Sequence, residues 1–215
     1  MLEAARWAIA LIGSTIAGLW DLKTTDIPDP VCVGMIALAL LLAYFDGSMS
    51  ITLMAGSLAL AFSLAMYFAG QWGGGDGELL VANIMLLASI DESLALGFFV
   101  NLFLIGAVYS IVYCVVYAKI NGKKLNLTSL EDIFVSRIPT KNLKPGDMLG
   151  EDIPKLGLKK IHIRGLTMEE VKRIKKSKKF VFIREGVRFG PVFALAGIAT
   201  YFCGNLMFYF LSALL

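Results

Sequence analysis

The sequence predicts an all-α polytopic membrane protein with six transmembrane helices and a small α+β domain between the fifth and the sixth. Hydrophobic residues make up 57% of the chain, charged residues make up 17%, and the mean hydropathy is +0.72. Soluble globular domains are less apolar and carry about 25% charged residues. Six apolar stretches alternate with polar connections, and one connection, residues 119–188, holds eighteen of the twenty Lys and Arg residues. This pattern excludes a soluble globular protein.

Each apolar stretch is interpreted as one crossing, because a transmembrane helix needs about 20 apolar residues. The expected spans are residues 4–20, 31–45, 50–69, 79–90, 93–118 and 189–215. The fourth stretch alone would rise only about 18 Å. We therefore expect residues 73–78 to complete it at the edge of a locally thin bilayer.

Three domains follow from these boundaries. Residues 1–118 hold helices one to five, residues 119–188 form a soluble α+β domain, and residues 189–215 form the sixth helix. Within the soluble domain, residues 158–164 alternate like a strand, and residues 179–189 alternate again through an expected hairpin at residues 185–186. Between them, Thr167 and Glu170 form a predicted capping box at the start of a helix.

The distribution of charge predicts the orientation in the cell membrane. The connections after spans one, three and five contain Lys23 and the basic segment, whereas the connections after spans two and four contain Asp46, Asp91 and Glu92 but no Lys or Arg. By the positive-inside rule, the soluble domain faces the cytoplasm and both termini lie outside. The domain's excess of base over acid favours contact with anionic lipid headgroups, or forms a solvated basic face. No motif indicates nucleic-acid binding.

Two acidic stretches lie on the predicted cytoplasmic side. They read DLKTTDIPDP (residues 21–30) and GGGDGE (residues 73–78). An ionised carboxylate at the centre of a membrane helix costs about 2.5–3.5 kcal/mol, so Asp21 and Asp76 are candidates for a function. Two carboxyl groups that meet can share one proton, and such a pair hydrolyses peptide bonds. Taken singly, Asp21 is equally a charge at a helix end and Asp76 an N-cap.

Together these stretches resemble the motifs of the type IV prepilin peptidases and the archaeal preflagellin peptidases, which are intramembrane aspartyl proteases named for a GxGD motif. The residues that carry the resemblance are Gly73, Gly74, Gly75 and Asp76, and Asp21, Lys23, Ile27 and Pro28. The resemblance implies that Asp21 and Asp76 are the catalytic pair and that no cofactor is needed. It also implies that the substrates are preflagellin-like or prepilin-like precursors with a short basic leader.

One position departs from the family pattern. Many relatives have Lys two residues after the GxGD aspartate, where this chain has Glu78. We expect Glu78, with Asp26 and Asp29, to contact the basic leader; the alternative is that all three are solvated loop acids. Lys23, Gly73 and Gly75 are the other candidate residues for substrate binding.

No metal site is expected, because Cys32, Cys114 and Cys203 lie in separate spans without C-x-x-C spacing. The single histidine, His162, is interpreted as the outward residue of a strand. Two other functions stay open. One is a presenilin-like intramembrane protease, although that plan has nine spans. The other is an ion-coupled carrier that uses intramembrane carboxylates.

Overall fold

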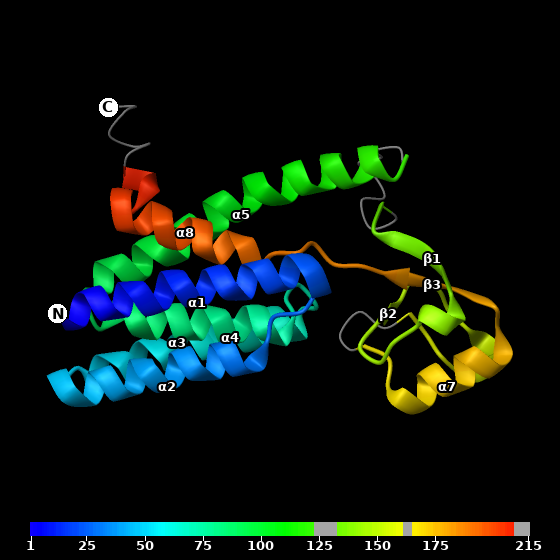
Figure 1. Ribbon diagram of the computed structural model, residues 1–215, viewed down its shortest axis with the longest axis horizontal. Helices are drawn as coiled ribbons and strands as arrows, with labels where there is room; N and C mark the ends of the chain where they lie inside the picture. Colours follow the sequence, from blue (N-terminus) through cyan, green and yellow to red (C-terminus); the bar gives the residue numbers. More distant parts are fainter. Residues whose placement is uncertain (123–132, 161–164, 209–215) are drawn as a thin grey trace. The chain divides into compact units, whose positions relative to one another are not determined.

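The computed structural model describes residues 1–122, 133–160 and 165–208. The chain divides into two compact units, shown in Figure 1. The first comprises Met1–Ile111 and Arg188–Leu215, and the second comprises Val112–Val187.

The first unit is helical. Its helices are α1 (Leu2–Thr24), α2 (Asp29–Asp46), α3 (Met49–Phe68), α4 (Gly74–Ala88), most of α5 (Glu92–Ile120) and α8 (Gly190–Cys203). Among the described residues, four helices are long and apolar enough to cross a membrane, namely α1, α2, α3 and α5, while α8 is a shorter apolar helix. A mostly helical fold with several apolar spans is thus confirmed. Six crossings remain a prediction, and residues 209–215 of the sixth expected span lie outside the described residues.

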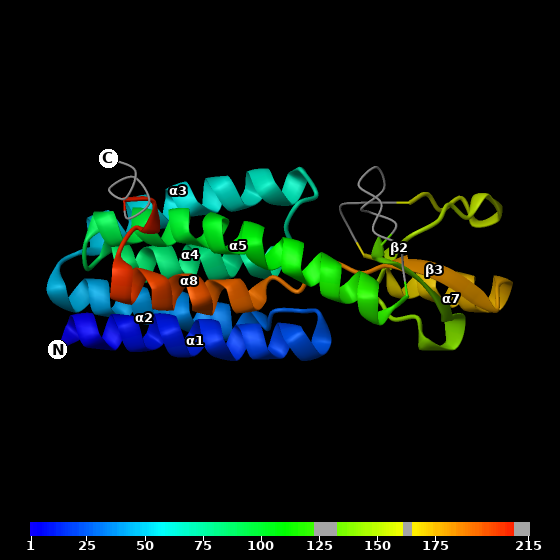
Figure 2. The same ribbon diagram turned by 90° about the horizontal axis from the view of Figure 1, so that it is seen from above.

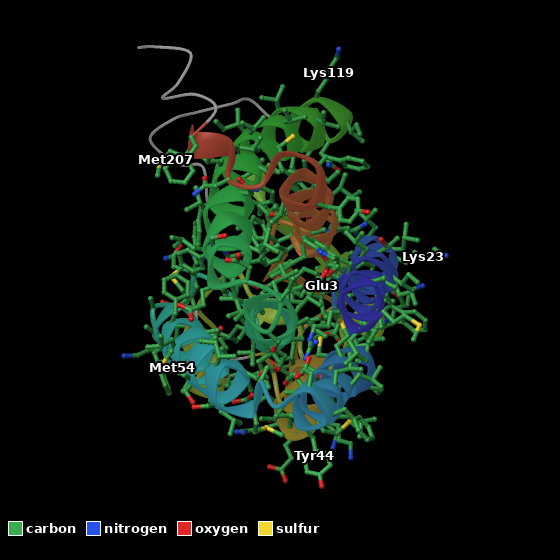
Figure 3. The ribbon with its side chains drawn as sticks, turned by 90° about the vertical axis from the view of Figure 1, so that its left-hand side faces the viewer. Glu3, Lys23, Tyr44, Met54, Lys119 and Met207 are labelled. Carbon is green, nitrogen blue, oxygen red and sulfur yellow. The ribbon has the colours of Figure 1, made fainter. Side chains whose placement is uncertain are left out.

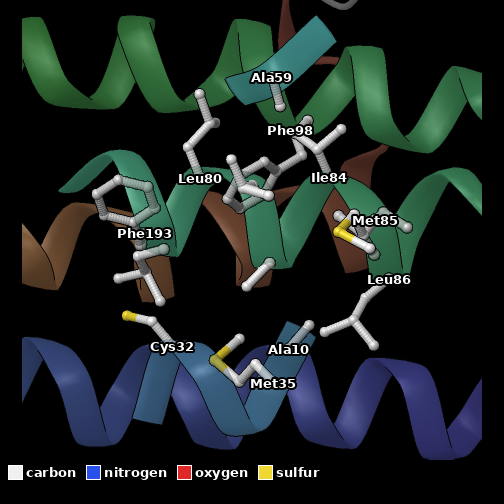
Figure 4. Close-up of a cluster of buried hydrophobic side chains, with 14 of the residues drawn as sticks. Ala10, Cys32, Met35, Ala59, Leu80, Ile84, Met85, Leu86, Phe98 and Phe193 are labelled. Carbon is white, nitrogen blue, oxygen red and sulfur yellow. The ribbon is translucent and has the colours of Figure 1, made fainter. Parts of the chain in front are cut away.

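Helix α4 lies at the centre of the helices of this unit (Figure 3). Every residue from Leu79 to Ala88 is buried, and α4 contacts α1, α2, α3 and α8. Figure 4 shows its side chains Leu80 and Met85 packed among residues of the surrounding helices. A helix that is apolar on all sides and enclosed by other helices does not have to match the hydrocarbon thickness by itself. This explains how α4 can have only fifteen residues.

The helical unit exposes many large apolar residues on its outside and buries several polar residues in its interior. Leu58 and Val108 are exposed, whereas Asn83, Asn101 and Thr200 are buried. The Asn101 amide nitrogen donates to the Thr200 hydroxyl at 3.0 Å, and both amide groups of the two asparagines are hydrogen-bonded within the unit. An apolar exterior around a polar interior is the arrangement that a lipid solvent favours. The chain is a membrane protein.

The second unit contains a small antiparallel sheet and helix α7 (Met168–Ser177). The strands are β1 (Val135–Pro139), β2 (Met148–Leu149) and β3 (Phe180–Arg184), in the order β1-β3-β2. The predicted capping box is confirmed, because the Thr167 hydroxyl accepts from Glu170 N at 3.3 Å and Glu170 Oε2 accepts from Thr167 N at 2.8 Å.

Two predictions about strands differ from the structure. The hairpin at residues 185–186 is wrong: β3 ends at Arg184, and residues 185–189 continue without strand structure to α8. The partners of β3 are β1 and β2, which precede it in the chain. In the strand expected over residues 158–164, Leu158 forms an isolated bridge with Ile153. Residues 161–164, including His162, lie outside the described residues.

Candidate active site

Asp21 lies in the last turn of α1, on the face that packs against α8. It is 6% exposed, and its Oδ2 accepts a hydrogen bond of 2.8 Å from the backbone N–H of Gly190, at the start of α8. The approach is possible because Gly18 and Gly190 have no side chains. A Cβ on Gly18 would lie 2.9 Å from the Pro191 backbone, and a Cβ on Gly190 would lie 2.8 Å from Asp21 Cβ. The start of α8 therefore fixes the position of the Asp21 carboxyl group.

Asp76 lies in the first turn of α4 and is partly buried. Its Oδ2 accepts a hydrogen bond of 3.1 Å from the backbone N–H of Gly73. This bond satisfies one of the backbone N–H groups left unpaired at a helix start, and a carboxylate there faces the positive end of the helix dipole. The N-cap is therefore Gly73 and not Asp76, which occupies the third helical position, and the bond to Gly73 orients the Asp76 carboxyl group.

The two acidic motifs contact each other through Ile27 and Gly75. Ile27 is buried, and a Cβ added to Gly75 would lie 2.7 Å from Ile27 Cβ. The segment that follows Asp21 therefore packs directly on the loop that carries Asp76. The structure brings Asp21, Asp76, Gly73 and Gly75 to the same end of the helical unit.

The other two predicted residues have different surroundings. Lys23 is exposed in the last turn of α1, where its positive charge faces the negative end of the helix dipole. Glu78 is partly buried in α4, and the negative charge of Asp29 is nearby. Glu78 Oε2 is buried and has no hydrogen-bond partner among the residues that the structure describes. A buried carboxylate oxygen without a partner is costly.

Sequence reasoning missed Arg188 and Gly190. The Arg188 guanidinium donates to the Leu22 carbonyl at the end of α1, and its positive charge acts on Asp21. The Tyr109 hydroxyl donates to the Arg188 carbonyl at 2.8 Å. The Gly-Pro pair at residues 190–191 is a typical signal for a helix start. Nothing local in the sequence indicates that this start meets Asp21, which lies 169 residues earlier.

The described part of the chain contains no group of three or more His, Cys, Asp or Glu side chains that could hold a metal ion. The three cysteines are free, and Cys32 is buried while Cys203 is exposed. The chemistry available at this end of the helices is therefore that of carboxyl groups, backbone N–H groups and one guanidinium.

Comparison with known proteins agrees with this geometry. The model of the type IV leader peptidase family matches residues 8–115, which is just over half of the 215 residues and includes both aspartates. No curated protein matches the chain. Because the family model matches just over half of the chain, from within α1 through most of α5, the chain belongs to the type IV leader peptidase family.

Proposed function

We propose that this protein is an aspartyl endopeptidase that removes a short basic leader from preflagellin-like or prepilin-like precursors at the cytoplasmic face of the membrane. The observation that carries the proposal is that α1 ends with Asp21 and α4 begins with Asp76 at the same end of the helical unit, where Ile27 packs on Gly75. Membership of the leader peptidase family supports the reaction class.

The carboxyl pair would act by general acid–base catalysis. One carboxylate takes a proton from a water molecule as the water oxygen attacks the carbonyl carbon of the scissile bond, while the other, protonated, carboxyl group gives its proton to the carbonyl oxygen. When the tetrahedral intermediate breaks its C–N bond, a proton passes to the leaving amine. The products are a leader with a new carboxylate and a mature chain with a new amine. The Arg188 charge beside Asp21 reduces the repulsion between the paired acids.

The acidic residues beside the pair suit a basic leader. Glu78 has a buried oxygen without a partner in the described part of the chain, and Asp29 is exposed nearby. A Lys or Arg side chain of the leader would supply the missing hydrogen bond to Glu78. The partial burial of Glu78 does not fit the alternative of a solvated loop acid, whereas Asp26 is exposed, as that alternative expects.

The carrier alternative is disfavoured by the buried amides. Asn83 and Asn101, the amide side chains of the middle helices, are engaged with Ser14, Thr200 and the Gly204 carbonyl. Their hydrogen bonds join helices to one another. A transport path would need polar groups that face a water-filled cavity instead.

Cleavage of a synthetic precursor tests the proposal. The substrate has a leader rich in Lys and Arg, followed by an apolar segment, and the purified protein is reconstituted in lipid. We expect one cut where the polar leader meets the apolar segment, and a loss of about 10²–10⁴-fold in rate for Asp21→Asn and for Asp76→Asn. Cleavage retained in either variant, or no cleavage by the parent, would overturn the proposal.

Asp91→Asn is the matched control for loss of an acid. Asp91 lies between α4 and α5, is exposed, and accepts a 2.7 Å hydrogen bond from Ser93 N. Hydrogen bonds from Ser93 lower the pKa of Asp91, so it is an ordinary ionised surface acid. Its variant should cleave at the parental rate.

A further inference from the structure

A pair of buried polar side chains joins the two helices that carry the aspartates. Ser14 of α1 and Asn83 of α4 are each 1% exposed. The Ser14 hydroxyl lies 3.1 Å from Asn83 Oδ1, and Asn83 Nδ2 lies 3.0 Å from Ser14 Oγ and 2.8 Å from the Leu79 carbonyl oxygen. The reaction scheme above uses neither residue.

The spacing of this pair matches the spacing of the aspartates. Ser14 precedes Asp21 by seven residues, and Asn83 follows Asp76 by seven residues. Seven residues make about two turns and rise about 10.5 Å, so each polar residue shares a helix face with its aspartate. Helix α1 ends and α4 begins at the same end of the unit (Figure 1). When Ser14 is level with Asn83, Asp21 is therefore level with Asp76.

The small buried residues of α1 beside Ser14 do little to resist sliding of α1 against α4, and two of them, Gly13 and Gly18, face Met35 of α2 and Pro191 of α8. Ala10, Gly13, Ala17 and Gly18 are buried on α1. Small residues let helices approach closely but offer few projecting side chains that would resist sliding. A buried polar pair resists sliding, because a slip leaves both partners unsatisfied in apolar surroundings. A single buried polar residue sets register in coiled coils in the same way.

We propose that Ser14 and Asn83 are positioning residues that set the register of α1 against α4 and thereby hold the carboxyl groups of Asp21 and Asp76 level. The enzymatic consequence rests on the proposed function. A slip of one residue is about 1.5 Å along the axis. Misplacement of reacting groups by about 1 Å lowers rates by about 100-fold.

The first test compares two variants that each remove one hydroxyl from a contact between helices, Ser14 in the buried contact with α4 and Ser89 in the half-buried contact that follows the end of α4. Ser14→Ala breaks the contact with α1, and Ser89→Ala breaks the contact with α3, where Thr52 Oγ1 and Ser89 Oγ are 2.5 Å apart. We expect Ser14→Ala to lower kcat by about 10–100-fold with KM within about twofold of the parent. Ser89→Ala should leave both constants within about twofold, although both variants lower the thermal midpoint to a similar extent. Equal kcat in the two variants would overturn the proposal.

The second test reads the register without peptidase activity. Asp21→Cys and Asp76→Cys are combined in a protein whose Cys32, Cys114 and Cys203 are replaced by Ala, and a short bifunctional maleimide measures the rate of cross-linking. Adding Ser14→Ala should slow cross-linking by about 10-fold or more, whereas adding Ser89→Ala should not. Unchanged cross-linking with Ser14→Ala would overturn the register role. If the parent cleaves no precursor yet its cross-linking depends on Ser14, the proposed function fails and the register role stands.

Discussion

At the scale of single residues, the site depends on two glycines as well as on the two aspartates. Gly75 lies where a side chain would collide with Ile27, and Gly190 lies where one would collide with Asp21. Neither glycine has a positive φ, so the backbone would accept another residue at both positions. Close approach, rather than conformational freedom, explains these two glycines.

Gly75→Ala should therefore disturb the site, because its Cβ would lie 2.7 Å from Ile27 Cβ and 3.3 Å from the Ile27 carbonyl oxygen. We expect kcat/KM for a basic-leader precursor to fall by about 100-fold as the two motifs are pushed apart. Gly74→Ala is the matched control, since a Cβ there meets nothing within 4 Å. Equal losses in the two variants would contradict the role of the Ile27 contact.

The unpartnered carboxylate of Glu78 leads to a prediction about the substrate. Glu78→Gln keeps the shape and removes the charge, so KM for a precursor with a basic leader should rise by about 10-fold, because hydrogen bonds to charged groups contribute about 1.5–3 kcal/mol. For a precursor whose leader Lys and Arg are replaced by Gln, parent and variant should have equal KM. An unchanged KM for the basic leader would show that Glu78 does not contact it.

At the scale of elements, opposite ends of α1 are held by different contacts. Near its C-terminus, α1 packs on α8 through Gly18 and Asp21. Near its N-terminus, Arg6 forms an ion pair of 2.5 Å with Asp46, and its guanidinium donates to the Ser48 hydroxyl at the turn between α2 and α3. The helix that carries the first aspartate is thus fixed at both ends.

The two partners of the Arg6–Asp46 ion pair differ in burial. Substitutions of the two residues should therefore lower the free energy of unfolding by different amounts. The Arg6 side chain is 1% exposed and the Asp46 side chain is 24% exposed. Asp46→Asn leaves a buried guanidinium without a counter-charge and should lower the free energy of unfolding by about 3 kcal/mol. Arg6→Met leaves a carboxylate that water can reach, so it should cost less. Thermal unfolding in detergent measures both, and a larger loss for Arg6→Met would contradict this account.

The sequence predicts the helices of this protein better than its strands. Each apolar stretch carries its own signal, so α1, α2, α3 and α5 lie where hydropathy predicts them. Of the three strands that the structure describes, β3 (Phe180–Arg184) lies within the alternation predicted over residues 179–189, whereas β1 and β2 have no comparable local signal. Strand β2 has two residues, and β1 ends at a proline and pairs with β3, which lies about 40 residues later in the chain.

The sequence likewise predicts one part of the candidate site, the identity of its aspartates, better than the other part, the contacts around them. Asp21 and Asp76 could be identified from short motifs, because each stands in a local pattern, DLKTTDIP or GGGD, that resembles the family's. The contacts that orient them could not. Gly190 and Arg188 reach α1 from the far end of the sequence, and the Ser14–Asn83 contact joins residues 69 positions apart. Such contacts depend on how the helices pack, which local patterns do not specify.

At the scale of the whole molecule, the Arg6 contact bears on the orientation. Arg6 is a basic residue near the N-terminus, which the orientation predicted from charge puts outside, and Asp46 neutralises its charge. The remaining asymmetry comes from residues 119–188, which carry eighteen basic residues. By the positive-inside rule, we expect this segment to lie in the cytoplasm.

Cysteine labelling in intact cells measures this orientation. In a protein without Cys32, Cys114 and Cys203, we expect Lys155→Cys to react with a membrane-impermeant maleimide only after the cells are opened. Glu92→Cys, at the start of α5, should react in intact cells. Both positions are exposed, so the comparison reports sidedness. Reaction of Lys155→Cys in intact cells would invert the orientation.

The central claim is that the Asp21 and Asp76 carboxyl groups act as one unit on one water molecule. Single-turnover cleavage of a basic-leader precursor by Asp21→Asn, Asp76→Asn and the double variant tests it most directly. Groups that act as a unit are strongly non-additive, so the double variant should be no slower than the slower single variant, at a loss of about 10²–10⁴-fold. A double variant whose loss equals the product of the two single losses would show that the carboxyl groups act independently and would contradict the claim.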